Sequence, residues 1–225
     1  MSARARLAAL VTATLIVPAL GLAQPRPAPQ QPAPAQASTS IRGFADLGST
    51  MFAASDSFEA VLGTSTGTLF GGGGEVLLPR RIFVSLRASR FQKDGERVFA
   101  FAGETFGLGI DTTIRVTPIE LSAGYRFGTP RWRVVPYAGG GLGWHRYEET
   151  SAFAEDEENV KETHRGYHLM GGVEVRLARW FGVGGEAQWT TVPDALGQDP
   201  NGVSTAFDET DLGGATLRVK VIIGR

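Results

Sequence analysis

The sequence of 225 residues contains no cysteine. A disulfide framework, a thiolate metal site and a lipid anchor on a cysteine are therefore excluded. The chain also carries almost no net charge, with 22 Lys and Arg against 23 Asp and Glu. This balance does not indicate a nucleic-acid-binding protein. Only three histidines are present, which leaves few candidates for a catalytic base or a metal ligand.

Long apolar runs are missing everywhere except near the start of the chain. Arg4 and Arg6 precede an apolar segment over residues 7–20, and small residues follow at positions 21 and 23. The apolar segment is shorter than the roughly 20 residues of a membrane-spanning helix, and Pro18 interrupts it. We therefore predict a signal peptide over residues 1–23 that is cleaved after export, with a membrane anchor as the alternative.

A tract rich in Pro, Ala and Gln follows the signal peptide. Proline at this density blocks helical and ladder hydrogen bonds, so we predict an extended, disordered linker over residues 24–39. The linker is interpreted as a spacer, and reaching toward a periplasmic partner is the alternative. The remaining residues, 40–225, are predicted to form one domain.

The clearest pattern lies in residues 163–191, THRGYHLMGGVEVRLARWFGVGGEAQWTT. Two runs alternate with a period of two and are joined by a short turn at residues 178–180, which predicts an antiparallel hairpin. One face is apolar with aromatic residues near its ends, and the other carries glycine and charges of both signs. In a soluble sandwich the charged face would meet water, whereas in an outer-membrane barrel it would line the lumen.

Similar alternation predicts six further strands, and the connections between strands fall into two kinds. The other predicted strands cover residues 40–51, 68–78, 82–89 and beyond, 112–127, 132–147 and 212–223. The strand that starts at Ile82 either continues past Gly95 to Phe101 or is divided by a loop. Loops are predicted over residues 103–111, 148–162 and 193–208, whereas the turns at 79–80, 128–131 and 178–180 are tight.

Short turns at one end and long loops at the other are typical of a transmembrane barrel. We therefore predict an all-β fold, an eight-stranded antiparallel up-and-down transmembrane β-barrel. The alternative is a soluble barrel such as a lipocalin, which would need an apolar interior. Aromatic residues gathered toward strand ends, such as Trp144 and Trp189, favour the membrane barrel because they suit the two lipid–water boundaries.

Acidic and basic residues nearly balance on the predicted lumen face. They are Arg42, Asp46, Glu75, Arg87, Glu120, Arg126, Glu174, Arg176, Glu186, Arg218 and Lys220. An eight-stranded barrel has an interior only just wide enough for side chains, and an unpaired buried ion costs several kcal/mol. We therefore predict that these charges pair and plug the lumen. The four consecutive glycines at 71–74 are interpreted as room for long charged neighbours, because no Lys-Ser/Thr follows to complete a phosphate-binding loop.

No catalytic, cofactor or metal site is predicted. His164 and His168 are four residues apart in a strand, roughly 13 Å, which is too far to share a metal ion. No Gly-x-Ser-x-Gly elbow occurs, and His145 or His168 could serve a lipid-facing nucleophile only if the two faces were reversed. The acidic run 155–158 is predicted to be solvated, with a divalent-cation bridge to lipopolysaccharide as the alternative.

The segments PYAGGGLGWHRY (136–147) and GYHLMGGVEVRLARWFGVGGEAQW (166–189) resemble the outer-membrane β-barrel domain family of OmpA-transmembrane-like, OmpW-like and opacity-type proteins. The resemblance extends over residues 40–223. It implies insertion by the outer-membrane assembly machinery, contact with outer-membrane lipid and lipopolysaccharide, and possible surface ligands at the long loops. Family members usually end on an aromatic residue, whereas this chain ends in Ile223, Gly224 and Arg225.

From these features we expect a structural or surface-interaction role in the outer membrane, without enzymatic activity or a nucleic-acid partner. A narrow pore for small solutes is the alternative, and hydrolysis of acyl lipids is a distant one.

Overall fold

The computed structural model describes residues 39–101, 104–129, 131–151, 160–197 and 202–224. The predicted signal peptide and all of the predicted linker except Thr39 lie outside these residues, and so does the acidic run 155–158. No helix in the described part of the chain is long and apolar enough to cross a membrane.

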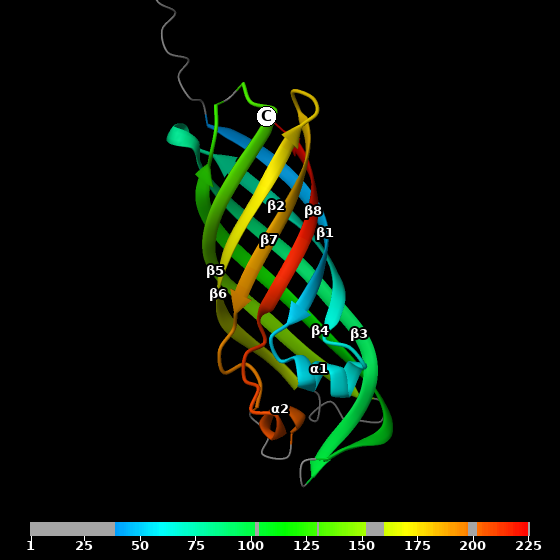
Figure 1. Ribbon diagram of the computed structural model, residues 1–225. Helices are drawn as coiled ribbons and strands as arrows, with labels where there is room; N and C mark the ends of the chain where they lie inside the picture. Colours follow the sequence, from blue (N-terminus) through cyan, green and yellow to red (C-terminus); the bar gives the residue numbers. More distant parts are fainter. Residues whose placement is uncertain (1–38, 102–103, 130, 152–159, 198–201, 225) are drawn as a thin grey trace, which may run out of the picture. The chain divides into compact units, whose positions relative to one another are not determined.

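Eight strands form a closed barrel in which each strand pairs with its neighbour in the sequence and β8 pairs with β1 (Figure 1). The strands are β1 (Ser40–Phe52), β2 (Thr66–Leu77), β3 (Ile82–Phe101), β4 (Glu104–Arg126), β5 (Val134–Ser151), β6 (Val160–Arg176), β7 (Phe181–Thr191) and β8 (Gly214–Gly224). Every pairing is antiparallel. The predicted fold class, an eight-stranded up-and-down barrel, is confirmed.

The two ends of the barrel differ. The tight turns and the end of β8 lie together at one end, where the 3₁₀ turn η1 (Pro79–Arg81) joins β2 to β3 (Figure 1). The helices α1 (Ser55–Leu62) and α2 (Val203–Ala206) lie at the other end. α2 falls in the loop predicted over residues 193–208, and α1 lies between the strands predicted over residues 40–51 and 68–78. In a barrel of this layout the short turns face the periplasm and the longer connections face outward, so we call these the turn end and the loop end.

The longest hairpin, β3–β4, shows that one predicted loop is wrong and that the predicted strand from Ile82 is continuous. β3 runs without interruption from Ile82 to Phe101, with a shift in its pairing to β4 between Glu96 and Val98. The loop predicted over residues 103–111 is wrong, because β4 already begins at Glu104. Its glycine-rich start is weakly strand-forming, but it is held by ladder pairing and by Glu96, whose carboxylate accepts a hydrogen bond from the Gly109 N–H at 2.6 Å.

The acidic loop predicted over residues 148–162 is also too long. β5 extends to Ser151 and β6 begins at Val160, and the two strands still pair at Glu149 and Val160. Glu148 and Glu149 are adjacent, so their side chains point to opposite faces of the strand while the backbone continues the ladder.

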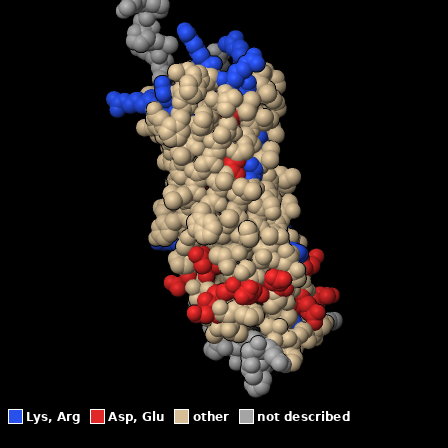
Figure 2. Space-filling view, in the orientation of Figure 1, with Lys and Arg blue, Asp and Glu red and all other residues tan. Residues whose placement is uncertain are grey.

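Most of the outward face of the barrel is apolar, and we call this band of exposed apolar side chains the apolar belt. Leu169 and Leu217 on this face are 71% and 66% exposed, and β7 and β8 each have 11 residues, the length with which a tilted strand crosses a bilayer. Figure 2 shows a broad band with few charged atoms between basic side chains at the turn end and an acidic belt near the loop end. The interior at mid-barrel is charged rather than apolar, so a soluble barrel with an apolar interior is not supported.

Candidate functional site

Glycines on the inward face make room for large side chains in the lumen. A Cβ atom added at Gly73 would lie 2.9 Å from the ring of Phe44, and one at Gly172 would lie 2.6 Å from the Tyr137 hydroxyl. Each would also lie too close to a backbone carbonyl oxygen of the neighbouring strand, that of Leu86 for Gly73 and, at 2.5 Å, that of Gly185 for Gly172. The narrow lumen can therefore hold aromatic and long charged residues only because the facing strands lack side chains at these positions.

Four charged residues form a layer near the turn end, which we call the lower ring. Arg42 contacts Glu75 and donates from Nη1 to Glu174 Oε1 at 2.9 Å. Arg126 donates from Nη2 to Glu174 Oε2 at 2.7 Å and lies 3.5 Å from Glu75. All four residues are buried, and two acids face two bases, so their formal charges cancel. Arg176 lies 3.4 Å from Glu174 but its side chain is 32% exposed at the edge of this layer.

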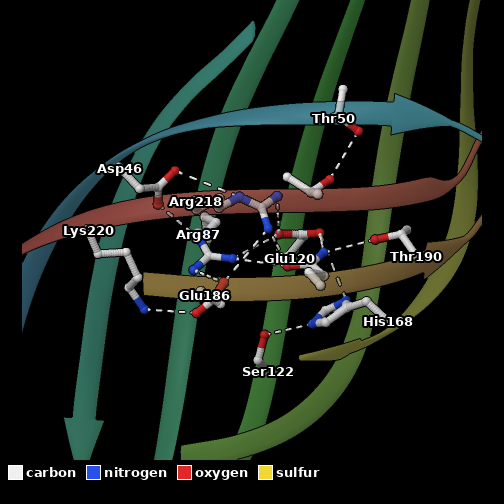
Figure 3. A network of polar contacts seen from close by, with 12 residues as sticks. Asp46, Thr50, Arg87, Glu120, Ser122, His168, Glu186, Thr190, Arg218 and Lys220 are labelled. Atoms are coloured by element: carbon white, nitrogen blue, oxygen red, sulfur yellow. Dashed lines mark hydrogen bonds and ion pairs between the residues drawn. The ribbon is translucent and has the colours of Figure 1, made fainter. Parts of the chain in front are cut away.

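A second layer, the central cluster, lies at mid-barrel (Figure 3). It consists of Asp46, Arg87, Glu120, Glu186, Arg218 and Lys220. Arg87 lies at its centre, 2.7 Å from Glu186 and 3.2 Å from Asp46. It also lies 3.6 Å from Glu120. Three acids and three bases again cancel.

The other two bases of the central cluster complete it from β8. Lys220 Nζ lies 3.1 Å from Glu186 Oε2 and 4.5 Å from the centre of the Phe44 ring. Arg218 lies within 4 Å of all three acids, at 3.7 Å from Glu186, 3.8 Å from Glu120 and 3.9 Å from Asp46. Such shared contacts offset the cost of removing these ions from water, which no single pair would do.

Neutral side chains also form hydrogen bonds with the central cluster. Gln188 accepts hydrogen bonds from Arg218 at 2.6 Å and from Arg87 at 3.1 Å, and its amide nitrogen donates to Glu120 and Thr190. The Tyr137 hydroxyl donates to Glu186 at 2.9 Å. Gln188 therefore joins Arg87 and Arg218 to Glu120 by hydrogen bonds, in addition to their direct ion pairs, and it extends the polar network to Thr190.

The two layers contain every residue of the predicted lumen set except Arg176, which lies at the edge. Sequence reasoning did not single out Gln188, Tyr137, Ser122 or His168 as members of the network. Alternation along each strand is enough to place these residues on the inward face. They were not assigned to the network because only charged side chains were collected for it.

Ser122, His168 and Glu120 lie in the order of a catalytic triad inside the lumen. Ser122 Oγ lies 2.8 Å from His168 Nε2, whereas His168 Nδ1 lies 4.0 Å from Glu120 Oε1. The second distance is too long for a hydrogen bond, and Glu120 already faces two arginines. All three side chains are buried within the barrel, away from any lipid substrate, so this arrangement does not present a nucleophile to lipid.

The remaining histidines belong to separate environments. His145 is buried on the inward face of β5, and His164 lies opposite it on β6, where its ring is 3.0 Å from Glu162. In the described part of the chain, no group of three or more His, Asp or Glu side chains could hold a metal ion.

An apolar cluster lies on the loop-end side of the central cluster. We call it the outer plug; its members are Phe52, Ala54, Phe58, Leu62, Leu69, Phe91, Ile114, Val116, Tyr147, Val192, Ala195 and Leu212. The rings of Phe52 and Phe58 stack with centroids 4.0 Å apart. A cavity of about 50 Å³ lies between the outer plug and the central cluster, and Phe52, Glu120 and His145 are among the residues that line it.

A helix that folds into the mouth supplies part of the outer plug. Phe58 and Leu62 of α1 are buried, and they are one helical turn apart and so share a face. Glu209 accepts hydrogen bonds from the backbone N–H groups of Asp56 and Ser57 at 3.1 and 2.8 Å. N–H groups of the first helical turn have no acceptor within the helix, so Glu209 caps α1 from a distant part of the chain.

Comparison with known proteins agrees with this geometry. The family model of the outer membrane protein beta-barrel domain matches residues 17–219. The chain belongs to this family. A search of curated proteins finds no match for the sequence.

Solved structures share the fold of this outer-membrane barrel. A major outer membrane protein from Thermus thermophilus matches with a TM-score of 0.54 and 11% identity, over 82% of this chain and 99% of that one. Neisserial surface protein A matches with a TM-score of 0.51 and 13% identity, over 82% of this chain and 96% of that one. OprG from Pseudomonas aeruginosa matches with a TM-score of 0.49 and 16% identity, over 83% and 92%. At these identities the first two similarities show the fold and not an activity.

Proposed function

We propose that this outer-membrane barrel has a structural or surface-interaction role and that its lumen is closed to solutes. The observation that carries the proposal is the succession of three layers along the barrel: the lower ring, the central cluster and the outer plug. The first two are charged but internally paired, and the third is apolar. A hydrated ion would have to break paired charges and then cross an apolar layer, and both steps are costly.

The cavity between the central cluster and the outer plug does not provide a path. At about 50 Å³ it can hold a small number of water molecules. Its walls include side chains of both neighbouring layers, such as Arg218 and Phe52. We infer that it is a small pocket between the two layers and not a passage through them.

Conductance of the purified barrel in planar bilayers tests the closed lumen. The full mature chain is expected to show no stable nanosiemens-scale channel. The double variant Phe58→Ala/Leu62→Ala, which weakens only the outer plug, is also expected to remain closed because both charged layers persist. A large, stable conductance in the unmodified protein would contradict the proposal and favour the narrow pore.

We further propose that the loop end is the surface that meets other molecules. A cavity of about 400 Å³ opens there among α1, α2 and the extensions of β3 to β6; Phe58, Val98, Leu108, Tyr147 and Val203 are among its lining residues. Cavities of this size suit small ligands. Surface ligands are therefore expected at the loop end.

Placement in the outer membrane implies the remaining partners. We propose that the outer-membrane assembly machinery inserts the barrel and that its apolar belt contacts outer-membrane lipid and lipopolysaccharide. Extraction of the membrane-bound protein with detergent, followed by a gel with and without heating, tests this placement. A folded barrel should migrate differently before and after heating, whereas a protein that stays in solution without detergent would contradict the proposal.

A further inference from the structure

Outward-facing charges are distributed unequally around the barrel. Along β7, β8, β1 and β2, as the structure describes them, no outward-facing residue is charged. The pattern on β3, β4, β5 and β6 is different. Counted from the turn end, the outward-facing residues of each of these strands are uncharged until an arginine occurs. These arginines are Arg90 on β3, Arg115 on β4, Arg146 on β5 and Arg165 on β6.

The four arginines begin where the apolar belt ends. Arg146 follows Trp144 by two residues on the outward face of β5, and Arg165 precedes Tyr167 by two on β6; Trp144 and Arg165 are paired in the ladder. Both aromatic residues are exposed on the outward face, and such residues mark the lipid–water boundary of a membrane barrel. The arginines therefore lie at headgroup level on the loop-end side.

Contacts with Gln92 and Glu148 order three of these arginines into a row, and we call this row together with Arg165 the arginine ladder. Gln92 accepts from Arg90 at 2.8 Å and from Arg115 at 3.2 Å. Glu148 accepts from Arg115 at 3.0 Å and lies 2.7 Å from Arg146. One carboxylate thus serves two guanidinium groups, and the row keeps a net positive charge.

The arginines of the ladder have N–H donors that its contacts do not use. Each guanidinium carries five N–H donors, and the contacts of the ladder use at most two on any of its arginines. The Arg146 side chain is 57% exposed, and Arg165 is exposed beside it on the next strand. Preordered guanidinium groups with unused donors are suited to bidentate contacts with phosphate.

We propose that the arginine ladder binds the phosphate groups of a phosphorylated glycolipid of the outer leaflet, on the wall formed by β3 to β6. The loop end faces outward, which places the ladder in the outer leaflet, and the apolar belt beneath it receives the acyl chains. The uncharged wall of β7, β8, β1 and β2 has no equivalent. The inference rests on the proposed placement in the outer membrane and is independent of the closed lumen.

Binding of purified lipid A to the folded barrel in detergent, followed by native mass spectrometry at low salt, tests the proposal. The variant Arg146→Gln/Arg165→Gln is expected to bind bisphosphorylated lipid A at least about tenfold more weakly, the effect of losing roughly one charge-assisted hydrogen bond. Its binding of a phosphate-free analogue should not change. The conservative variant Arg146→Lys/Arg165→Lys should retain part of the affinity because charge is kept but bidentate geometry is lost.

A matched control removes the same charge at the other boundary. Arg131 and Arg133 are exposed at the turn end, and Arg131→Gln/Arg133→Gln should bind lipid A within about twofold of the unmodified protein. Equal loss in both double variants, or no loss in the ladder variant, would overturn the proposal. Equally ladder-dependent binding of phosphatidylglycerol would also overturn it. Failure to extract the protein from membranes as a folded barrel would instead contradict the proposed placement.

Discussion

Arg42 and Glu174 are 132 positions apart in the sequence, yet Arg42 Nη1 lies 2.9 Å from Glu174 Oε1 inside the barrel. Glu174 is 1% exposed and also accepts a hydrogen bond from Arg126. One carboxylate therefore compensates two buried guanidinium groups. Loss of Glu174 should therefore destabilise the barrel more than loss of a surface ion pair, because a buried ion that loses a partner has no access to water.

Replacement of Glu174 by alanine should destabilise the barrel by about 3–5 kcal/mol, because the two buried arginines Arg42 and Arg126 would then share Glu75 as their acidic partner. Urea unfolding in detergent micelles, followed by the gel shift between folded and unfolded forms, measures the change. Glu59→Ala is the control, because Glu59 is exposed on α1 and should cost less than about 1 kcal/mol. Equal effects of the two substitutions would show that the ion pairs of the lower ring do not stabilise the barrel.

Two neighbouring glycines of β6 should respond differently to alanine. A Cβ at Gly172 would lie 2.5 Å from the Gly185 carbonyl oxygen and 2.6 Å from the Tyr137 ring and hydroxyl, whereas a Cβ at Gly171 would meet only the Tyr137 carbonyl oxygen at 3.8 Å. Gly172→Ala should therefore displace Tyr137 from Glu186 and cost about 1–3 kcal/mol by overpacking. Gly171→Ala faces outward and should be nearly neutral in the same unfolding measurement. A larger loss for Gly171→Ala would mean that the two faces of β6 are reversed.

The alternation of residues predicts on which face of a strand each charge lies, because a strand has a strict period of two. It could not predict that Arg42 meets Glu174 or that Gln188 joins Arg87 to Arg218. Those contacts depend on how strands far apart in the sequence are staggered around the barrel, which is fixed by closure of the whole sheet.

The outer plug was not predicted for a different reason. α1 has only eight residues, and a helix this short is not stable by local propensity alone. Its stability comes from packing of Phe58 against Phe52 and from capping by Glu209, 152 positions away from Ser57. The start of β4 over residues 104–111 was similarly missed, because glycine-rich segments are weak strand formers that become strands only when paired.

Loss of the distant cap should loosen α1 without unfolding the barrel. Glu209→Ala removes the acceptor of the Asp56 and Ser57 backbone donors and of the Ser57 hydroxyl, which donates at 2.6 Å. We expect a local cost of about 0.5–2 kcal/mol. Hydrogen exchange should become faster in α1, while the ladder amides of β7 and β8 and the gel shift stay unchanged. Unchanged exchange in α1 would show that packing alone holds the helix.

Glu148, which lies beyond Trp144 toward the loop end, should titrate below its usual range. The hydrogen bond from Arg115 is the main cause that lowers the Glu148 pKa from its ordinary value of 4.5, and the nearby Arg146 charge adds to it. Because the folded-state pKa is lowered, the pairing stabilises the protein fully above about pH 4.5 and this contribution is lost as the pH falls through the folded pKa.

Carboxyl-carbon NMR of the micelle-bound protein as a function of pH measures this titration directly. Arg115→Gln should move the Glu148 midpoint upward toward 4.5, because the main donor to its charged form is removed. Arg90→Gln is the matched control, since Arg90 contacts Gln92 and not Glu148. A Glu148 midpoint that is the same in both variants would mean that Arg115 does not hold this carboxylate, and the central link of the arginine ladder would then be absent in solution.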